Sequence, residues 1–220
     1  MKTKFIKSTL LALALVTSIN FGVVQSVYAA SNSAAIPTHA EPGTRIEYDK
    51  NNNMDILKGK IDETDSTSSD NSLPKPQPGM TVSYDGTGEP VFIKVNGKPY
   101  IDSEKTKEAE KNMSRSSYYE DSGAISWYDD KYGQSDHKLK DYDCATDMYS
   151  DNCALGTRIS VQDRDSGIWG NFKKWDVGNL KAQSEPRIID VWDLGIFEDV
   201  FQLDDGEAQG LIHNGYYYHY

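Results

Sequence analysis

Residues 187–192 read Arg-Ile-Ile-Asp-Val-Trp, and residues 157–161 read Thr-Arg-Ile-Ser-Val. Both runs are rich in β-branched side chains, which favour the pleated backbone of a strand. Asp, Gly and Asn residues separate these runs from their neighbours and supply turn signals. Short strands with frequent turns predict a small, mainly β domain whose strands close into a barrel.

The dense apolar and aromatic part of the chain extends over residues 123–220 and holds all four tryptophans and both cysteines. About 100 residues are enough for one small hydrophobic core. The apolar residues of 194–201 recur at helical spacing and predict one or two amphipathic turns. Further on, Asn214-Gly215 between apolar and tyrosine-rich runs predicts a closing hairpin.

The residues before this part have a different composition. Residues 30–78 are rich in Ser, Asn, Asp, Lys and Pro, so they offer little apolar surface to offset chain entropy. We expect a largely disordered acidic arm there, and a small hairpin with a connecting segment over residues 79–122. Asn96-Gly97 is the expected turn of that hairpin. Residues 43–49 resemble 79–85, which suggests a second short hairpin.

Residues 1–29 have the pattern of a cleavable secretory signal peptide. Lys2, Lys4 and Lys7 precede an apolar run, and Val27-Tyr28-Ala29 supplies small residues where signal peptidase requires them. The apolar run is short for a membrane anchor, and no stop-transfer charges follow it. We therefore expect an exported protein that is extracellular or lies in the cell wall.

The charge of the chain narrows the choice of partners. The chain has 23 basic and 34 acidic residues and a formal net charge of -11. Because the predicted signal peptide carries lysines and no acidic residue, its removal makes the rest more acidic. Nucleic acid and anionic lipid would be repelled by such a surface. We expect a monomer with no nucleic-acid partner, no membrane partner after signal cleavage and no cofactor.

Cys144 and Cys153 are the two cysteines of the chain. In an oxidising compartment a disulfide between them would close a loop of about ten residues and contribute roughly 2–3 kcal/mol in the chain-entropy model. A metal site is the alternative, but the sequence has no Cys-x-x-Cys element and only four histidines. We therefore expect a structural disulfide and no metal.

Four segments, in order, resemble those of rare lipoprotein A-like domains. Residues 123–128 resemble the family's Gly-x-Ala-Ser-Trp-Tyr opening, and residues 154–161 resemble its Pro-Leu-Gly-Thr-x-Val-x-Val strand. Residues 175–178 stand where the family has Asn-Asp-Arg-Gly, and residues 187–192 match Arg-Ile-Ile-Asp-Leu-Ser. The resemblance covers residues 123–220. It implies a six-stranded double-psi β-barrel, as in bacterial expansins, barwin-like proteins and the three-aspartate domain of lytic transglycosylases.

The same resemblance implies a cell-wall protein that binds and remodels polysaccharide, peptidoglycan in particular, through a groove with two aspartates. Asp176 is the expected acid for a transglycosylase-like cleavage and Asp190 its partner, because two neighbouring carboxyl groups push their pKa values apart. An expansin-like activity would use Asp190 and Ser126 to loosen polysaccharide packing without cleavage. Trp127, Tyr128 and Trp175 are expected to bind sugar, because aromatic faces stack on sugar rings.

Departures from the family pattern weaken the cleavage interpretation. Val177 and Asn179 replace an arginine and a proline of the family motif, and Ser150 stands where rare lipoprotein A has a catalytic-type histidine. Asp147 and Asp151 lie close to that position and are candidates for a third carboxylate.

Three alternatives therefore stay open beside polysaccharide remodelling. The barrel could bind a protein, as an effector or protease inhibitor without catalysis, or it could be an inert component of a surface layer. The two aspartates could also be structural, with Asp176 forming a turn and Asp190 accepting hydrogen bonds from buried backbone donors.

Overall fold

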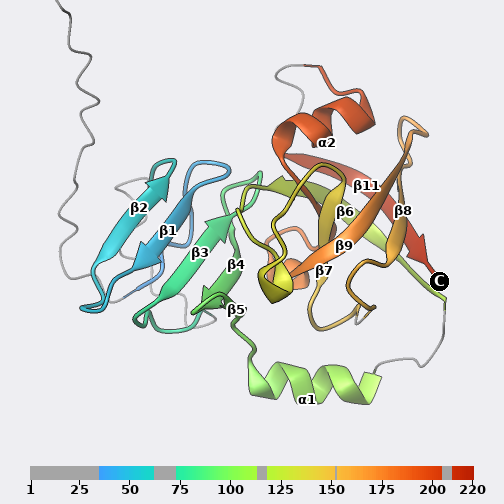
Figure 1. Ribbon diagram of the computed structural model, residues 1–220. Coiled ribbons are helices and arrows are strands. Elements are labelled where there is room, and N and C mark those ends of the chain that lie inside the picture. The colour runs from blue at the N-terminus through green and yellow to red at the C-terminus, as the bar shows by residue number, and fades with distance from the viewer. Residues whose placement is uncertain (1–34, 62–72, 113–117, 152, 205–209) are drawn as a thin grey trace, which may run out of the picture.

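The computed structural model shows a mainly β protein with two sheets and, in the part of the chain that it describes, two α-helices (Figure 1). The described residues are 35–61, 73–112, 118–151, 153–204 and 210–220. The predicted signal peptide over residues 1–29 lies outside them. Within the described part, no helix combines the length and the apolar character needed to cross a membrane.

The first sheet has five strands in the order β2-β1-β3-β4-β5, and every neighbouring pair is antiparallel. Its strands are β1 (Arg45–Tyr48), β2 (Met54–Lys58), β3 (Met80–Tyr84), β4 (Pro90–Val95) and β5 (Lys98–Pro99). The sheet has a hydrophobic core of its own, formed by Ile36, Ala40, Ile46, Tyr48, Met80, Val82, Tyr84 and Ile93.

Part of the segment expected to be a disordered arm is therefore folded, since β1 and β2 fall within residues 30–78. Ile46 and Tyr48 are fully buried. Composition alone misses this, because the few apolar residues of β1 are buried by pairing with the similar strand β3 far along the chain. The hairpin turn expected at Asn96-Gly97 joins β4 to β5, and both turn residues have the positive φ values that a two-residue turn requires.

The second sheet is a closed ring of six strands in the order β10-β6-β11-β8-β9-β7. The strands are β6 (Tyr119–Tyr128), β7 (Asp143–Asp147), β8 (Arg158–Asp163), β9 (Trp169–Gly178), β10 (Arg187–Trp192) and β11 (Leu211–His219). The pairs β6–β10 and β7–β9 are parallel, and the other four are antiparallel. The short strands predicted at 157–161 and 187–192 correspond to β8 and β10.

The ring has an internal two-fold pattern. The strands of the first half, β6, β7 and β8, correspond in that order to the strands of the second half, β9, β10 and β11. Under this correspondence the parallel pair β6–β10 matches the parallel pair β9–β7, and the antiparallel pair β6–β11 matches the antiparallel pair β9–β8. The remaining pairs, β7–β10 and β8–β11, map onto themselves. Two interlocked halves thus close the ring, and none of its strands keeps a free edge.

The two helices differ in their burial. α1 (Ser103–Asn112) connects the two sheets below the ring in Figure 1. α2 (Leu194–Phe201) spans the residues predicted to be helical, and its first turn is capped by the carboxylate of Asp193. α2 packs two buried phenylalanines into the ring core, which contains Ile125, Trp127, Cys144, Ile159, Val161, Phe172, Ile188, Ile189, Val191, Phe197, Phe201, Ile212 and Tyr217.

The closing hairpin predicted at Asn214-Gly215 is not formed. β11 continues through these residues with a register shift against β6. Gly215 approaches Ile125 so closely that a Cβ atom would lie 2.4 Å from its Cγ1, so the glycine allows close strand packing and not a chain reversal. Side chains after Gly215 therefore alternate, with Tyr217 and His219 buried in the protein.

The two sheets pack against each other through β4. The Phe92 ring stacks on the Tyr128 ring with centroids 4.1 Å apart, and both side chains are buried. Near them the backbone N–H of Gly86 donates to the carbonyl oxygen of Trp127. The apolar cluster between the sheets contains Val91, Phe92, Tyr128, Leu139, Ala145 and Leu180.

Removal of the Phe92 ring should destabilise the whole protein. We expect Phe92→Ala to lower the free energy of unfolding by about 3–5 kcal/mol, the usual effect of emptying a buried aromatic site. Urea unfolding followed by tryptophan fluorescence measures this. Leu57→Ala, at an exposed position of β2, is the matched control and should change stability by less than about 0.5 kcal/mol. Equal losses for the two variants would contradict the packing described.

Candidate functional site

The two predicted catalytic aspartates lie in one row across three neighbouring strands. Asp190 of β10 pairs with Ala145 of β7, and Ala145 pairs with Asp176 of β9. On its other side, Asp190 pairs with Ser126 of β6. Residues paired across strands point to the same face of a sheet, so the fold brings Ser126, Asp190 and Asp176 onto one face of the ring.

This face is covered by the five-stranded sheet and does not form an open groove. Ser126, Asp176 and Asp190 are all 0% exposed. Lys94 of β4 reaches down to Asp176, with 3.0 Å between Nζ and Oδ2, and also contacts a carboxylate oxygen of Asp130 at 2.8 Å. The predicted site is therefore closed by a side chain from outside the ring.

Asp176 is held mainly by this ion pair. Burial raises its pKa to about 6, while Lys94 and the backbone N–H of Val177, which donates at 2.9 Å, limit the rise. Burial alone would lower the pKa of Lys94, but the facing Asp176 and Asp130 carboxylates raise it above its usual value. The amine thus stays charged and compensates the carboxylates.

Asp190 lacks such compensation. Neither of its carboxylate oxygens has a hydrogen-bond partner among the described residues. Burial raises the pKa of Asp190 to about 8, the Asp85 charge adds to the rise, and the Arg187 charge opposes it. Arg187 itself is paired with Asp85 at 2.9 Å and Glu89 at 2.8 Å, both in the β3–β4 connection. Burial thus favours the neutral, protonated form of the Asp190 carboxyl group.

The aromatic residues expected to bind sugar are mostly inside the protein. Trp127 is 8% exposed and belongs to the ring core, and Tyr128 is fully buried under Phe92. Trp175 is half-buried and stacks on His137 with ring centroids 4.0 Å apart. In this arrangement none of the three offers an open ring face beside the aspartates.

The two other candidate carboxylates have structural contacts. Asp147 accepts hydrogen bonds from the backbone N–H groups of Tyr149, Ser150 and Lys181 and so fixes two connections of the ring. Asp151 accepts hydrogen bonds from the Tyr217 hydroxyl and the Cys153 backbone N–H.

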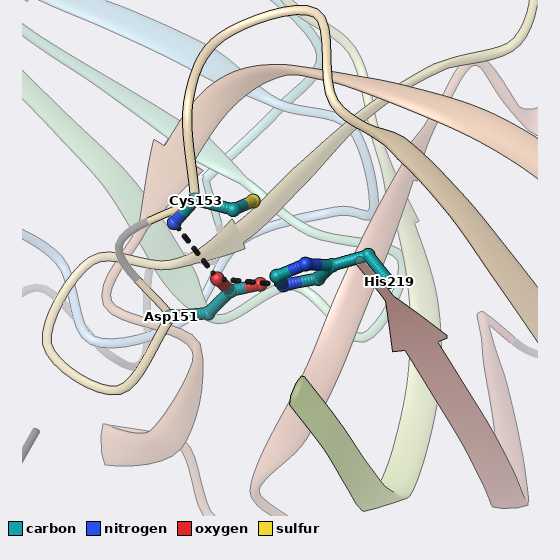
Figure 2. Close-up of side chains that lie close together, drawn as sticks. All are labelled: Asp151, Cys153 and His219. Carbon is teal, nitrogen blue, oxygen red and sulfur yellow. Dashed lines mark hydrogen bonds and ion pairs between the residues drawn. The ribbon is translucent and has the colours of Figure 1, made fainter. Parts of the chain in front are cut away.

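The predicted disulfide between Cys144 and Cys153 is wrong, because both cysteines are free thiols. Cys144 is fully buried in the ring core on β7, whereas Cys153 lies in the β7–β8 connection beside Asp151 and His219 (Figure 2). Burial raises the pKa of both thiols and therefore disfavours the thiolate form through which disulfides are made. Cys144 therefore contributes to stability by packing in the hydrophobic core and not by the expected disulfide.

Comparison with protein-family models and with curated proteins gives no match for this chain. The resemblance to rare lipoprotein A-like domains accordingly depends on the four motifs alone.

A group of exposed aromatic side chains lies on the outer face of the six-stranded sheet. Along β11, Tyr216, Tyr218 and Tyr220 alternate with buried neighbours. Trp169 meets Tyr216 and Tyr218 edge-on, with centroids 6.3 and 6.1 Å apart, and Tyr118 lies 6.1 Å from Tyr218 and 5.2 Å from Tyr220. We name these five residues the aromatic strip: Tyr118, Trp169, Tyr216, Tyr218 and Tyr220.

The aromatic strip is accessible and held in place. Trp169 is 47% exposed and Tyr220 83%. The hydroxyls of Tyr118 and Tyr216 donate to Glu120 at 2.7 and 2.5 Å, and the Arg164 guanidinium lies 4.5 Å from the centroid of the Tyr216 ring. The tyrosine-rich end of the sequence could have indicated this surface. The hairpin expected at Asn214-Gly215 prevented that, because that expectation did not treat residues 216–219 as part of one strand whose side chains alternate between exposed and buried.

Asp190 should make stability depend on pH. Its pKa is raised on folding, so the folded chain binds more protons than the unfolded chain between about pH 4 and pH 8, and stability falls as pH rises through that window. We expect Asp190→Asn to flatten this fall and to unfold at higher urea than wild type at about pH 9. Asp141→Asn, at an exposed position, is the control. Parallel pH curves for wild type and Asp190→Asn would contradict the burial of an unpaired carboxylate.

Proposed function

We propose that this chain is an exported cell-wall protein that binds polysaccharide through the aromatic strip and loosens its packing without cleaving it. The observation that carries the proposal is the exposed row of rings on β11 and β9. Aromatic faces provide large apolar contacts at low entropic cost, and sugar rings present apolar C–H faces to them. Peptidoglycan is the polysaccharide that the motif resemblance implies.

The geometry of the strip favours a polymer over a small molecule. Tyr216 and Tyr218 are 6.2 Å apart between ring centroids, and Tyr218 and Tyr220 are 5.8 Å apart. These rings follow an extended strand, so a ligand that touches three of them must itself be long and extended. A glycan chain has that shape.

We infer that the ring is the double-psi barrel implied by the motifs. Two features support this: the strand pairing is unchanged when the two halves of the ring are exchanged, and Asp176 and Asp190 lie on the two strands that flank β7. Of the two activities of such barrels, cleavage is disfavoured by the burial of the aspartates. A general acid must touch the glycosidic oxygen, but both carboxyl groups are fully buried, with Asp176 covered by Lys94 of β4 and Asp190 beside Asp85 of the β3–β4 connection. An expansin-like use of Asp190 and Ser126 is disfavoured in the same way, so the loosening proposed here depends on the aromatic strip.

The expected export supports a wall location. The pattern of residues 1–29 directs secretion, and the net charge of -11 suits movement through a matrix without capture by nucleic acid or anionic lipid.

A protein partner is the second candidate, and the same strip favours it. Trp, Tyr and Arg dominate the hot spots of protein interfaces, and Arg164 lies over Tyr216 within the strip. In that case the chain would act as an effector or inhibitor without catalysis.

Binding to purified insoluble peptidoglycan separates the two candidates, because it requires no protein partner. We expect the full chain to co-sediment, and Trp169→Ala to bind about tenfold more weakly, as for a hot-spot ring worth roughly 1–2 kcal/mol. Tyr132→Ala, at a 44% exposed tyrosine outside the strip, should bind as wild type does. Wild type that stays in the supernatant would overturn the glycan proposal, and equal binding of Trp169→Ala would remove the strip from it.

Incubation with peptidoglycan should release no soluble fragments. Because Asp176 and Asp190 are fully buried, we expect mass spectrometry to find no anhydro-sugar products, under conditions where an active lytic transglycosylase produces them. Products that disappear in Asp190→Asn would instead establish cleavage and show that the sheet over the aspartates opens.

A further inference from the structure

We infer that Asp151, Cys153 and His219 form a transition-metal site, and that Zn²⁺ is the ion it fits. One donor atom of each residue lies within 4.8 Å of the other two. Figure 2 shows the three side chains converging from the β7–β8 connection and from β11. A thiolate, an imidazole and a carboxylate are the donor types of protein zinc sites, with bond lengths of about 2.0–2.3 Å. Bonds of that length around a tetrahedral ion place neighbouring donors about 3.3–3.8 Å apart, so only a small contraction is required.

The fold brings these residues together from distant parts of the chain. Asp151 and His219 are 68 residues apart, and the His219 side chain points inward because of the alternation along β11. Asp151 is 2% exposed and His219 8%, so both donors are shielded from water. The distance between His219 Nε2 and Asp151 Oδ1 is 3.1 Å, and an ion would take the place of the proton between them.

Neighbouring contacts hold the donors in position. The Tyr217 hydroxyl donates to Asp151 Oδ2 at 2.9 Å, and the Cys153 backbone N–H donates to Oδ1 at 3.0 Å. The Tyr119 ring stacks on the His219 ring with centroids 5.5 Å apart and an interplanar angle of 14°. Partners of this kind orient ligands in metal sites and tune their affinity.

The charges favour a thiolate-binding ion over a hard cation. Asp151 is the one carboxylate of the set, whereas Ca²⁺ and Mg²⁺ need several oxygen ligands. Lys174 lies beside the set, with Nζ 3.2 Å from the Asp151 carbonyl oxygen and 2.8 Å from that of Cys153, and reduces the negative charge that a hard cation would need. Zn²⁺ binds the thiolate, so binding of the ion would release the Cys153 thiol proton into solvent.

The site borders a cavity that leaves room for a further ligand. Asp151, Cys153 and Lys174 line a cavity of about 660 Å³, together with Met148 and Tyr149. Three protein donors beside an open space are typical of zinc sites whose fourth position holds water or a small molecule. The cavity extends to β5 and α1, so such a ligand would enter between the ring and the first sheet.

Titration of the reduced full-length protein with metal alone tests the inference. We expect one equivalent of Zn²⁺ to bind by calorimetry, and Co²⁺ to give the near-ultraviolet charge-transfer absorption of a cobalt–thiolate bond. Cys153→Ser should lose that absorption, and Cys144→Ala, the matched control, should keep it. Tyr217→Phe should weaken Zn²⁺ binding about 10- to 100-fold, as loss of a supporting hydrogen bond does. His213→Gln, at the exposed histidine paired with Glu185, should bind as wild type does.

Thermal unfolding of the wild-type chain gives an independent measurement that needs no variant. Zn²⁺ should raise the unfolding midpoint, a chelator should reverse the rise, and Mg²⁺ should have no effect. Absence of a Zn²⁺-dependent shift, or a cobalt–thiolate absorption that survives in Cys153→Ser, would overturn the inference. Neither outcome bears on glycan binding, because no residue of the aromatic strip is a donor.

Discussion

The buried ion pair between Lys94 and Asp176 is the contact on which the arrangement of the two sheets depends. Lys94 comes from β4 and Asp176 from β9, and both are withdrawn from water. If the first sheet lifted away, each charge would lose its partner and the Phe92–Tyr128 stack would open with it. Breaking one partner of such a pair typically costs 3–5 kcal/mol, a large share of the stability of a small domain. The first sheet is therefore an integral part of the folded unit.

This arrangement separates two kinds of chemistry on the ring. The charged and titratable groups that the motifs single out lie under the first sheet, where burial raises the pKa of a carboxyl group such as Asp190. The rings able to contact a ligand lie on β11 and β9 and face solvent. The strand β11 has two different faces, since it presents tyrosines outward to solvent and Tyr217 and His219 inward to the interior of the ring. Alternation along that strand thus links the aromatic strip to the donor set at Asp151.

The sequence was informative where a local pattern decides the structure. The β-branched runs of β8 and β10, the spacing of α2 and the turn at Asn96-Gly97 each depend on neighbours in the chain, and each was predicted. Long-range packing decided the rest. Nothing near Asp176 indicates that Lys94, 82 residues away, would cover it, and the cysteine spacing could not show that Cys153 points toward His219. Gly215 was misjudged because close packing and turns both select glycine.

The exchange symmetry of the ring also constrains how it folds. The first strand of the ring, β6, pairs with the last two, β10 and β11. The ring therefore cannot close before nearly the whole chain is available. Contacts between such distant segments make folding slow, because the entropy of loop closure is lost before the contacts form. A nascent chain of this topology therefore cannot close its ring until its C-terminal strand has been synthesised, so its apolar strand faces stay unpaired for longer than those of a fold built from local contacts.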